Sequence, residues 1–420
     1  MLFASYGPQK YNESRHAISS VTAEMKGKKL LCLLLVSWWF CLGHAWLPRD
    51  TKIRGVNFGG LFIVEPWMMG DEWRSMGCAS YASEFDCVKG IGQAAANAAF
   101  QKHWATWINA TDIAQIKSLG LNTIRIPLGY WIKEDLVWEG EYWPQGGFYY
   151  LESLCRHATD AGLYIILDLH AAPGAQKAWE AFTGQMATTP GFYKDYNYER
   201  AIQLMEWLTN MAHTNPNFAN VGALQLINEP LQNYGIVQSM LHNYYPNAWK
   251  RIRAMEDNLG VIPSNRLHIM MMNGLWGSGD PNEGLRGIDL GLSLYDDHHY
   301  VKWTASVAAN RNAYIQHSCT DDRGGNSPTI VGEWSLSTAD EDGPEFDIKR
   351  DDAVAWYRRW WAAQVLCYEK QMGWIFWTWK VNWINGHLEW RWGYQQAYEA
   401  GVIPQNPQDA HAYGVCNGIS

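Results

Sequence analysis

The chain has 420 residues, of which 47% are hydrophobic and 18% are charged, and its formal net charge is −9. This balance excludes a nucleic-acid interface, which needs clustered lysine and arginine, and the length allows one large α/β domain or roughly two to three ordinary ones. The aromatic content is unusual, at 25 Trp and 22 Tyr. Because indole is a broad flat partner for the apolar faces of sugars, a carbohydrate groove and a large ordinary core both remain open.

The N-terminal segment has the features of a secretory signal. Three lysines between positions 26 and 29 precede the apolar run 30–43, and Gly-His-Ala at 43–45 is a small-x-small cleavage pattern. We interpret 25–45 as a signal peptide and 1–24 as an upstream extension that is not part of the mature protein. A membrane anchor is the alternative, but the run is shorter than the ~20 residues needed to span a bilayer. The mature protein is therefore expected outside the cell or in the cell wall.

The cysteines fit that compartment. Two of the eight lie in the signal segment, and an even number in an oxidising environment allows up to three disulfides. Cys78 and Cys87 lie in one loop and are the pair expected to bond, whereas the other pairings stay open. Asn109 begins an Asn-Ala-Thr acceptor for N-glycosylation in a eukaryotic secretory route. No Cys-x-x-Cys spacing indicates zinc, and no metal or cofactor is expected.

Eight apolar runs of strand length follow residue 50, most of them apolar on both alternations, as in parallel strands covered on each face. They are 53–60, 121–128, 163–170, 222–229, 266–273, 290–300, 329–335 and 373–380. Helical periodicity fills the gaps, for example at 201–213 and 354–370. Eight such units in about 350 residues predict a single (β/α)₈ TIM barrel domain, 46–420. A doubly wound sheet is the alternative, but no glycine-rich phosphate loop follows the first strand.

Polar or aromatic side chains stand at or near the C-terminal ends of these predicted strands. They are Arg125, His170, Asn228, Glu229, His298, Tyr300, Glu333 and Trp377. In a barrel these ends converge on the face that holds the active site. Two glutamates from strands four and seven would face each other across that mouth. Paired carboxylates around a sugar cleave glycosidic bonds, one as a protonated acid and the other ionised.

Simpler explanations exist for each residue alone. Glu229 could cap a strand, Glu333 could be a surface carboxylate, and His170 could be structural. Arg125 inside an apolar strand needs a carboxylate partner, because an unpaired buried cation is costly, and Glu333 is the expected one. Outer sugar-binding positions and core packing are equally open for three tryptophans: Trp67, Trp73 and Trp276.

Seven motifs in order carry a family resemblance: RGVNFGG, IRIPLGYW, DLHAAPGAQ, INEP, HHY, VGEWS and GWIFWTWK. Over residues 51–400 the chain resembles glycoside hydrolase family 5, and within it the fungal exo-β-1,3-glucanase and β-1,6-glucanase branches. The resemblance implies Glu229 as general acid/base and Glu333 as nucleophile. It also implies retention of anomeric configuration, with carboxyl groups ~5–5.5 Å apart.

The resemblance implies supporting roles as well. Asn228 would bond the sugar 2-hydroxyl, while Arg125 and Tyr300 would hold the nucleophile ionised. Two histidines would complete the sugar subsite: His170 and His298. Trp377 would be the platform under the reacting sugar, with Trp379 as its rival on the same alternation. Glu65 matches a carboxylate that binds the terminal sugar's hydroxyls in the exo-acting branch.

The expected function is that of a secreted, retaining β-glucan hydrolase acting on cell-wall polysaccharide, first of all a glucan exo-1,3-β-glucosidase. An endo-β-1,6-glucanase on the same scaffold is the alternative, followed by a transglycosylase and a non-catalytic glucan-binding wall protein. The chain departs from the exo-1,3 pattern at GGLFIVEPWM (59–68) and around the two loop cysteines. A monomer without membrane contact in its mature form is expected.

Overall fold

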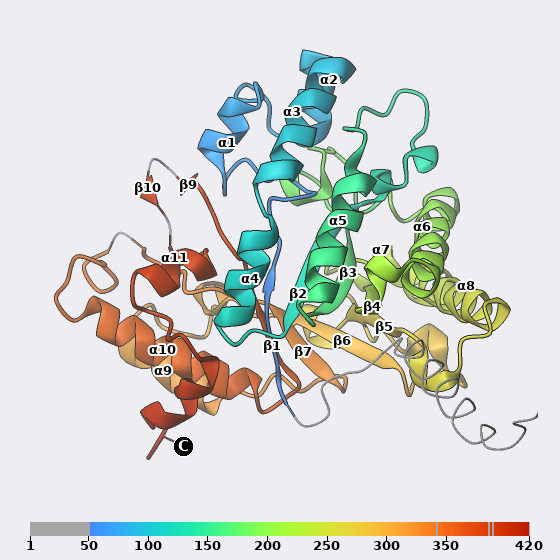
Figure 1. Ribbon diagram of the computed structural model, residues 1–420. Helices are drawn as coiled ribbons and strands as arrows, with labels where there is room; N and C mark the ends of the chain where they lie inside the picture. Colours follow the sequence, from blue (N-terminus) through green and yellow to red (C-terminus); the bar gives the residue numbers. More distant parts are fainter. Residues whose placement is uncertain (1–50, 342, 385–386, 389, 420) are drawn as a thin grey trace, which may run out of the picture. The chain divides into compact units, whose positions relative to one another are not determined.

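The computed structural model describes residues 51–341, 343–384, 387–388 and 390–419 (Figure 1). The expected signal peptide, 25–45, and the extension 1–24 lie outside these residues. Among the helices of the described residues, none has the length and apolarity that crossing a bilayer requires.

Eight parallel strands close into a barrel in chain order. They are β1 (Ile53–Asn57), β2 (Thr123–Gly129), β3 (Tyr164–Ala171), β4 (Val221–Gln225), β5 (His268–Met272), β6 (Ser293–His298), β7 (Thr329–Glu333) and β8 (Gly373–Phe376). The barrel closes where β8 pairs with β1, with Ile53 opposite Gly373. Gly373 has φ +130°, and a Cβ there would lie 1.9 Å from the Ile53 carbonyl oxygen, so the closing contact requires glycine. The predicted barrel is confirmed.

Most helices cover the barrel from outside, and the first two lie in the insertion after β1 (Figure 1). They are α1 (Gly70–Ser75), α2 (Glu84–Ile91), α3 (Gln93–Thr106), α4 (Ala110–Ser118), α5 (Gly147–Asp160), α6 (Asp195–Thr214), α7 (Tyr234–Ser239), α8 (Tyr245–Asn258), α9 (Arg311–Thr320), α10 (Ala353–Tyr368) and α11 (Tyr394–Glu399). The helical periodicity predicted at 201–213 and 354–370 falls in α6 and α10. Asn109 caps α4 in a capping box with Asp112 and is exposed; its glycosylation stays a prediction. A separate antiparallel pair consists of β9 (Trp383–Ile384) and β10 (His387–Leu388).

The barrel interior has an apolar floor and a charged layer above it. The floor is a buried cluster of one or two side chains from most strands, among them Ile53, Tyr164, Ile166, Met270 and Ile375. Nearer the C-terminal ends of the strands, the inward alternation brings in polar side chains, all buried: Asn57, Arg125, Asp168, Gln225 and Asp296. The strands therefore deliver a layer of charge to the C-terminal mouth, while the floor beneath excludes water.

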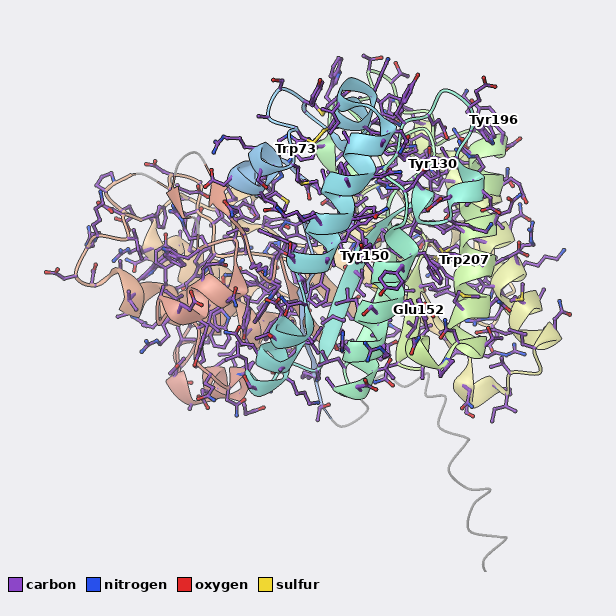
Figure 2. The ribbon with its side chains drawn as sticks, turned by 45° about the horizontal axis from the view of Figure 1, so that its top comes forward. Trp73, Tyr130, Tyr150, Glu152, Tyr196 and Trp207 are labelled. Atoms are coloured by element: carbon purple, nitrogen blue, oxygen red, sulfur yellow. A yellow bond between two sulfur atoms is a disulfide. The ribbon has the colours of Figure 1, made fainter. Side chains whose placement is uncertain are left out.

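The insertion after β1 is held by a disulfide between Cys78 and Cys87, which confirms the predicted pair. Trp73 of α1 (Figure 2) packs edge-on against Phe100 of α3, with ring centroids 6.3 Å apart, and belongs to the core. A second disulfide joins two residues 97 positions apart, Cys319 and Cys416. Two cysteines are free and buried: Cys155 and Cys367. The insertion is thus a folded part of the barrel mouth.

Candidate active site

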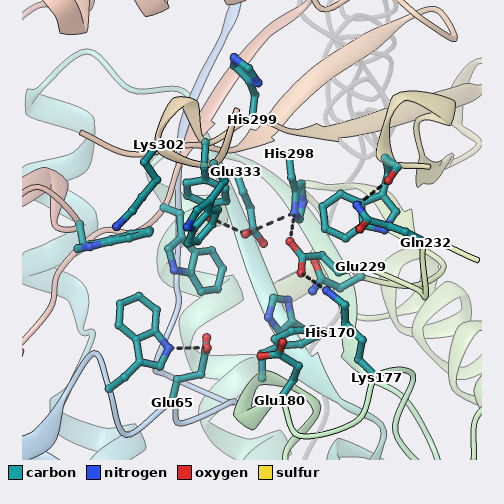
Figure 3. A pocket seen from close by; sticks show the side chains of 18 of the residues that line it. Glu65, His170, Lys177, Glu180, Glu229, Gln232, His298, His299, Lys302 and Glu333 are labelled. Carbon is teal, nitrogen blue, oxygen red and sulfur yellow. Dashed lines mark hydrogen bonds and ion pairs between the residues drawn. The ribbon is translucent and has the colours of Figure 1, made fainter. Parts of the chain in front are cut away.

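A cavity of about 760 Å³ opens at the C-terminal mouth (Figure 3). Eight of the nine residues predicted for catalysis or sugar binding line it: Glu65, His170, Asn228, Glu229, His298, Tyr300, Glu333 and Trp377. The ninth, Arg125, is fully buried and contacts Glu333. Residues from six of the eight strands or the loops after them therefore meet in one space.

The two glutamates face each other across this cavity. A carboxylate oxygen of Glu229 lies within 4.8 Å of one of Glu333. Both side chains are largely buried, 15% and 6% exposed respectively. A close pair of this kind suits a nucleophile and an acid/base on one sugar, and it leaves no room for the separate water that an inverting pair needs.

The chain after β4 is bent to present Glu229. The Asn228 amide donates to the Leu169 carbonyl of β3 at 2.9 Å, which continues the pairing past the end of the strand. Glu229 then takes φ +39°, in the left-handed region that a residue with a Cβ seldom adopts. Such a conformation costs roughly 1–3 kcal/mol and persists only where surrounding contacts impose it. The strand end is therefore shaped to aim a carboxylate into the cavity.

Arg125 organises the charged layer beneath the cavity. Its guanidinium nitrogens lie 2.8–3.0 Å from side-chain oxygens of five residues, as hydrogen bonds or ion pairs: Asn57, Asp168, Gln225, Asn228 and Glu333. Burial acts to lower the pKa of Arg125, but the negative charges of Asp168, Asp296 and Glu333 outweigh it and raise that pKa. The arginine is thus a permanent cation that holds Glu333 Oε1 at 3.0 Å.

Tyr300 holds the other oxygen of Glu333. Its hydroxyl donates to Oε2 at 2.9 Å. Burial, followed by the charges of Glu333 and Glu229, raises the pKa of Tyr300, so the hydroxyl keeps its proton and remains a donor. Both oxygens of Glu333 are therefore fixed by donors, as an attacking carboxylate requires.

His298 lies between the two glutamates. Its Nδ1 is 2.8 Å from Glu229 Oε1 and 3.5 Å from Glu333 Oε2, and its Nε2 is 3.0 Å from Asp296 Oδ2. Burial acts to lower the pKa of His298, yet these surrounding carboxylates raise it well above its ordinary value. The imidazole is therefore a cation that donates from both nitrogens.

This cation influences the pKa values of both glutamates in the substrate-free site. Burial acts to raise the pKa of Glu229, but the hydrogen bond and charge of His298 bring that pKa below its ordinary value. Burial raises the pKa of Glu333, and the neighbouring Glu229 adds to the rise, against the charges of His298 and Arg125. The family resemblance implied Glu229 as the proton donor, and that role stays a prediction, because these directions describe a site in which His298, and not a leaving oxygen, is the partner of Glu229.

Trp377, the predicted sugar platform, lines the cavity beside His170. The ring of Trp377 stacks on that of His170, with centroids 5.4 Å apart and planes 6° from parallel. The Nδ1 of this histidine lies 2.8 Å from Asp168 Oδ2, which fixes the ring. Trp379 is fully buried and donates its indole N–H to Asp112 at 2.8 Å. Of the two candidate tryptophans, only Trp377 lines the cavity.

Glu65 is a buried carboxyl in the loop after β1. Burial raises the pKa of Glu65 to about 7. The Trp67 indole donates to its Oε2 at 2.9 Å, while Oε1 has no partner among the described residues. A sugar hydroxyl is the kind of group that would satisfy this oxygen.

Several cavity residues lie on loops and were not predicted. They are Lys177, Glu180, Phe182, Lys302, Trp303, Glu341 and Trp392. Of the three tryptophans left open, Trp67 and Trp276 line the cavity, whereas Trp73 belongs to the core. The only available signal was position, since Lys177 follows the DLHAAPGAQ motif and Trp303 follows HHY.

Two clusters bring together atoms of metal-ligand type, each within 4.8 Å: Glu229, His298 and Glu333, and His299, His317 and Asp321. The first is neutralised internally by its protonated histidine. In the second, Asp321 Oδ2 lies 3.3 Å from Arg323 Nη1, a cation that opposes a metal ion there. Neither set has the chemistry of a strong metal site.

The comparisons with known proteins agree with this geometry. The family model for Cellulase (glycosyl hydrolase family 5) matches residues 88–382. The "Glucan endo-1,6-beta-glucosidase B" of Emericella nidulans is 52% identical over 372 residues, covering 88% of this chain and 90% of that protein. The "Probable glucan endo-1,6-beta-glucosidase B" of Aspergillus fumigatus is 54% identical over 372 residues, covering 84% and 92%.

More distant proteins share the scaffold. The "Glucan 1,3-beta-glucosidase" of Blumeria graminis is 29% identical over 397 residues, covering 85% of this chain and 88% of that one. The solved structure of rutinosidase from Aspergillus niger superposes with a TM-score of 0.66 at 19% identity, covering 84% and 98%, which supports the fold alone. By its fold, its family match and its curated relatives, this chain belongs to glycosyl hydrolase family 5 and is a glycoside hydrolase.

Proposed function

We propose that this protein is an endo-β-1,6-glucanase that cleaves cell-wall glucan with retention of configuration. The observation that carries the proposal is the close pair of Glu229 and Glu333 at the barrel mouth. The linkage is supported by relatives: those at 52–54% identity are named for endo-1,6 action, whereas the 1,3-glucosidase relative is 29% identical. These identities favour endo-1,6 cleavage, which was the alternative, over the exo-1,3 activity that was expected first.

The chemistry follows from where each atom lies. Glu333 attacks the anomeric carbon while Glu229 gives its proton to the leaving oxygen, and a covalent glycosyl-enzyme forms. Glu229 then takes a proton from water, whose oxygen displaces Glu333. The Oδ1 of Asn228 accepts from Arg125 at 2.8 Å, so its amide nitrogen is the group that can donate to a sugar hydroxyl.

The reaction requires that the proton shared by the two glutamates lies on Glu229. In the substrate-free site Glu333 has the raised pKa and Glu229 the lowered one. The pair titrates together, so ionising one favours protonating the other. When a leaving oxygen replaces His298 as the partner of Glu229, the bond that keeps Glu229 ionised is lost, and the donors on Glu333 then favour its ionised form. His298 lies within 3.5 Å of both carboxylates, so the path is short.

Internal cleavage needs sugar-binding surfaces on both sides of the pair. On the nucleophile side, the rings of Tyr300 and Trp303 are in contact, with centroids 4.9 Å apart. The rings of Trp67 and Trp392 form a second pair there, with centroids 5.2 Å apart. On the acid/base side, Trp276 contacts His298 at 5.7 Å. Aromatic surfaces on both flanks favour a polymer that passes through the cavity.

Secretion is part of the proposal and rests on the segment 25–45. Two disulfides among the described residues fit an oxidising compartment. N-terminal sequencing of protein collected outside the cell should begin at Trp46, and a protein retained in the cytosol would contradict the assignment.

Digestion of pure glucans tests the proposed activity. We expect pustulan, a β-1,6-glucan, to yield a ladder of oligomers early in the reaction, and laminarin, a β-1,3-glucan, to yield far less. Glucose alone from laminarin would restore the exo-1,3 assignment. Products longer than the substrate would assign transglycosylation, and no product from either would leave only glucan binding.

A further inference from the structure

Lys177 is placed directly against the acid/base. It lies in the loop after β3, and its Nζ is 3.6 Å from Glu229 Oε2 (Figure 3). Its side chain is only 23% exposed. Because His298 bonds the other oxygen, each oxygen of Glu229 faces a cation. The proposed chemistry described so far gives this lysine no part.

The surrounding residues hold Lys177 in this place. Its Nζ lies 5.1 Å from the ring centroid of Trp276 and 5.6 Å from that of Phe182. Aromatic faces attract an ammonium group, and more strongly where water is partly excluded. The Trp276 indole in turn donates to the Pro230 carbonyl at 2.8 Å, immediately after Glu229. The aromatic wall behind the lysine is therefore anchored to the loop that carries the acid/base.

A buried glutamine couples the two loops. Gln176, next to Lys177, donates from Nε2 to the His170 carbonyl at 2.6 Å and to the Asn228 carbonyl at 3.0 Å. It is fully buried, so these bonds are not exchanged with solvent. The loop that carries the lysine and the strand end that carries the glutamate are thus joined through the residues next to each of them.

Charged groups face Glu229 from several elements. The cations are Lys177 in the loop after β3 and His298 on β6, with His170 on β3 contributing a favourable charge. Three carboxyl groups and one phenol oppose them: Glu65, Glu180, Tyr300 and Glu333. Lys177 is the one cation that contacts Glu229 Oε2 among the described residues.

We propose that Lys177 is a positioning residue that acts through Glu229, by stabilising the carboxylate which Glu229 becomes on giving its proton to the leaving glucan oxygen. This inference rests on the proposed function. In the first step the bond from Glu333 to the anomeric carbon forms, the carbon–oxygen bond breaks, and its electron pair takes the Glu229 proton. In the second step Glu229 accepts a proton from water as the water oxygen displaces Glu333. The ammonium thus helps Glu229 to release its proton in the first step and keeps it ionised for the second, and it lowers the pH above which the proton needed for the first step is lost.

The pH dependence of kcat/KM on a soluble β-1,6-glucan oligosaccharide tests this. The alkaline limb reports the pH at which the Glu229–Glu333 pair in the free enzyme loses the proton that the two carboxyl groups share. Removing the ammonium in Lys177→Met takes a positive charge away from this pair, so the pair keeps the proton to higher pH and the limb should move up by about one pH unit. Lys177→Arg keeps the charge and should keep the limb near its wild-type position. Lys177→Gln is a second neutral variant should the methionine variant fold poorly, as judged by its melting temperature.

Lys302 provides the matched control. It lines the same cavity, but its Nζ pairs with Glu341 at 2.9 Å, and Glu229 is not its partner. Lys302→Met should leave the alkaline limb in place even if KM changes. The inference would be overturned if the alkaline limb of kcat/KM stayed in place in both neutral Lys177 variants. It would also be overturned if Lys177→Arg moved the limb as far as the neutral variants do. Absent β-1,6 cleavage by the wild type would instead overturn the proposed function, and the lysine series would then be measured on the glucan that is cleaved.

Discussion

The active site has two parts that are built differently: a buried layer of polar side chains on the strands, and a rim of side chains on the loops around the cavity. The layer, Arg125, Asp168, Gln225 and Asp296, is fully buried and hydrogen-bonded through strands of the closed barrel. At the rim, Trp67 and Trp303 are 41% and 65% exposed and stand on loops. A fixed layer suits the steps common to all substrates, whereas a separate rim can vary. The difference indicates that bond cleavage depends on the strands and linkage preference on the loops.

The largest expected effect is on the strand side. Glu333→Gln keeps the size of the side chain and its contact with Arg125 but removes the attacking carboxylate. Turnover of β-1,6-glucan, measured as reducing sugar released, should fall by about a thousandfold or more. The melting temperature should stay close to that of the wild type. Activity within about tenfold of the wild type would remove Glu333 from its role.

The strands and the polar residues at their ends were also the part of the site that the sequence predicted. Two-sided apolar runs located all eight strands, and the polar residues at their ends led to Glu229 and Glu333, because strand ends have a fixed place in a barrel. Arg125 was found by the same logic, since a cation in an apolar strand demands a buried partner.

The loop side could not be predicted, because loop residues follow no period. Lys177, Lys302 and Trp303 occupy the cavity through loop conformations that no local pattern encodes. The pKa of Glu229 is lowered by the 2.8 Å contact with His298, and the sequence alone does not show this contact. The Cys319–Cys416 disulfide joins residues 97 apart, and only the folded chain reveals that pairing.

Substitutions in the buried layer should lower the free energy of unfolding more than substitutions at the rim. Arg125→Met leaves three buried carboxylates, Asp168, Asp296 and Glu333, without their shared cation, which should cost about 3–5 kcal/mol of unfolding free energy in urea. Lys302→Met at the rim breaks a partly exposed pair and should cost about 1 kcal/mol or less. Equal losses in the two variants would contradict the contrast between layer and rim.

Glu65 sharpens the comparison, because it is a rim residue that is nevertheless buried. Its pKa rises from 4.5 to about 7 on folding, so between these values the folded state binds more protons than the unfolded state. Stability from this group is therefore lost as pH rises, by up to about 3 kcal/mol. Glu65→Gln should remove that loss, so the stability difference between variant and wild type should grow from pH 4.5 to 7.5. A stability difference that does not change with pH would contradict the raised pKa of Glu65.

The smallest expected effect belongs to the exposed rim. Trp303→Ala should raise KM for β-1,6-glucan by about tenfold through lost stacking. The value of kcat should change little, since the link from Trp303 to Glu333 runs through Tyr300. Trp138→Ala is the control, because Trp138 is also exposed, at 48%, but is not among the residues that line the cavity. Equal effects in both variants would argue against a sugar-binding rim at Trp303.

Trapping the covalent intermediate tests the central claim most directly. An activated 2-deoxy-2-fluoro glucoside carrying a second β-1,6-linked glucose should glycosylate the nucleophile as its activated leaving group departs. The sugar should then be released slowly, because fluorine destabilises the positive charge that develops on the sugar in the second step. Mass spectrometry of the digested protein should find the sugar on Glu333. A label on Glu229 or on a residue outside the cavity would contradict the account, and so would steady turnover with no labelled peptide.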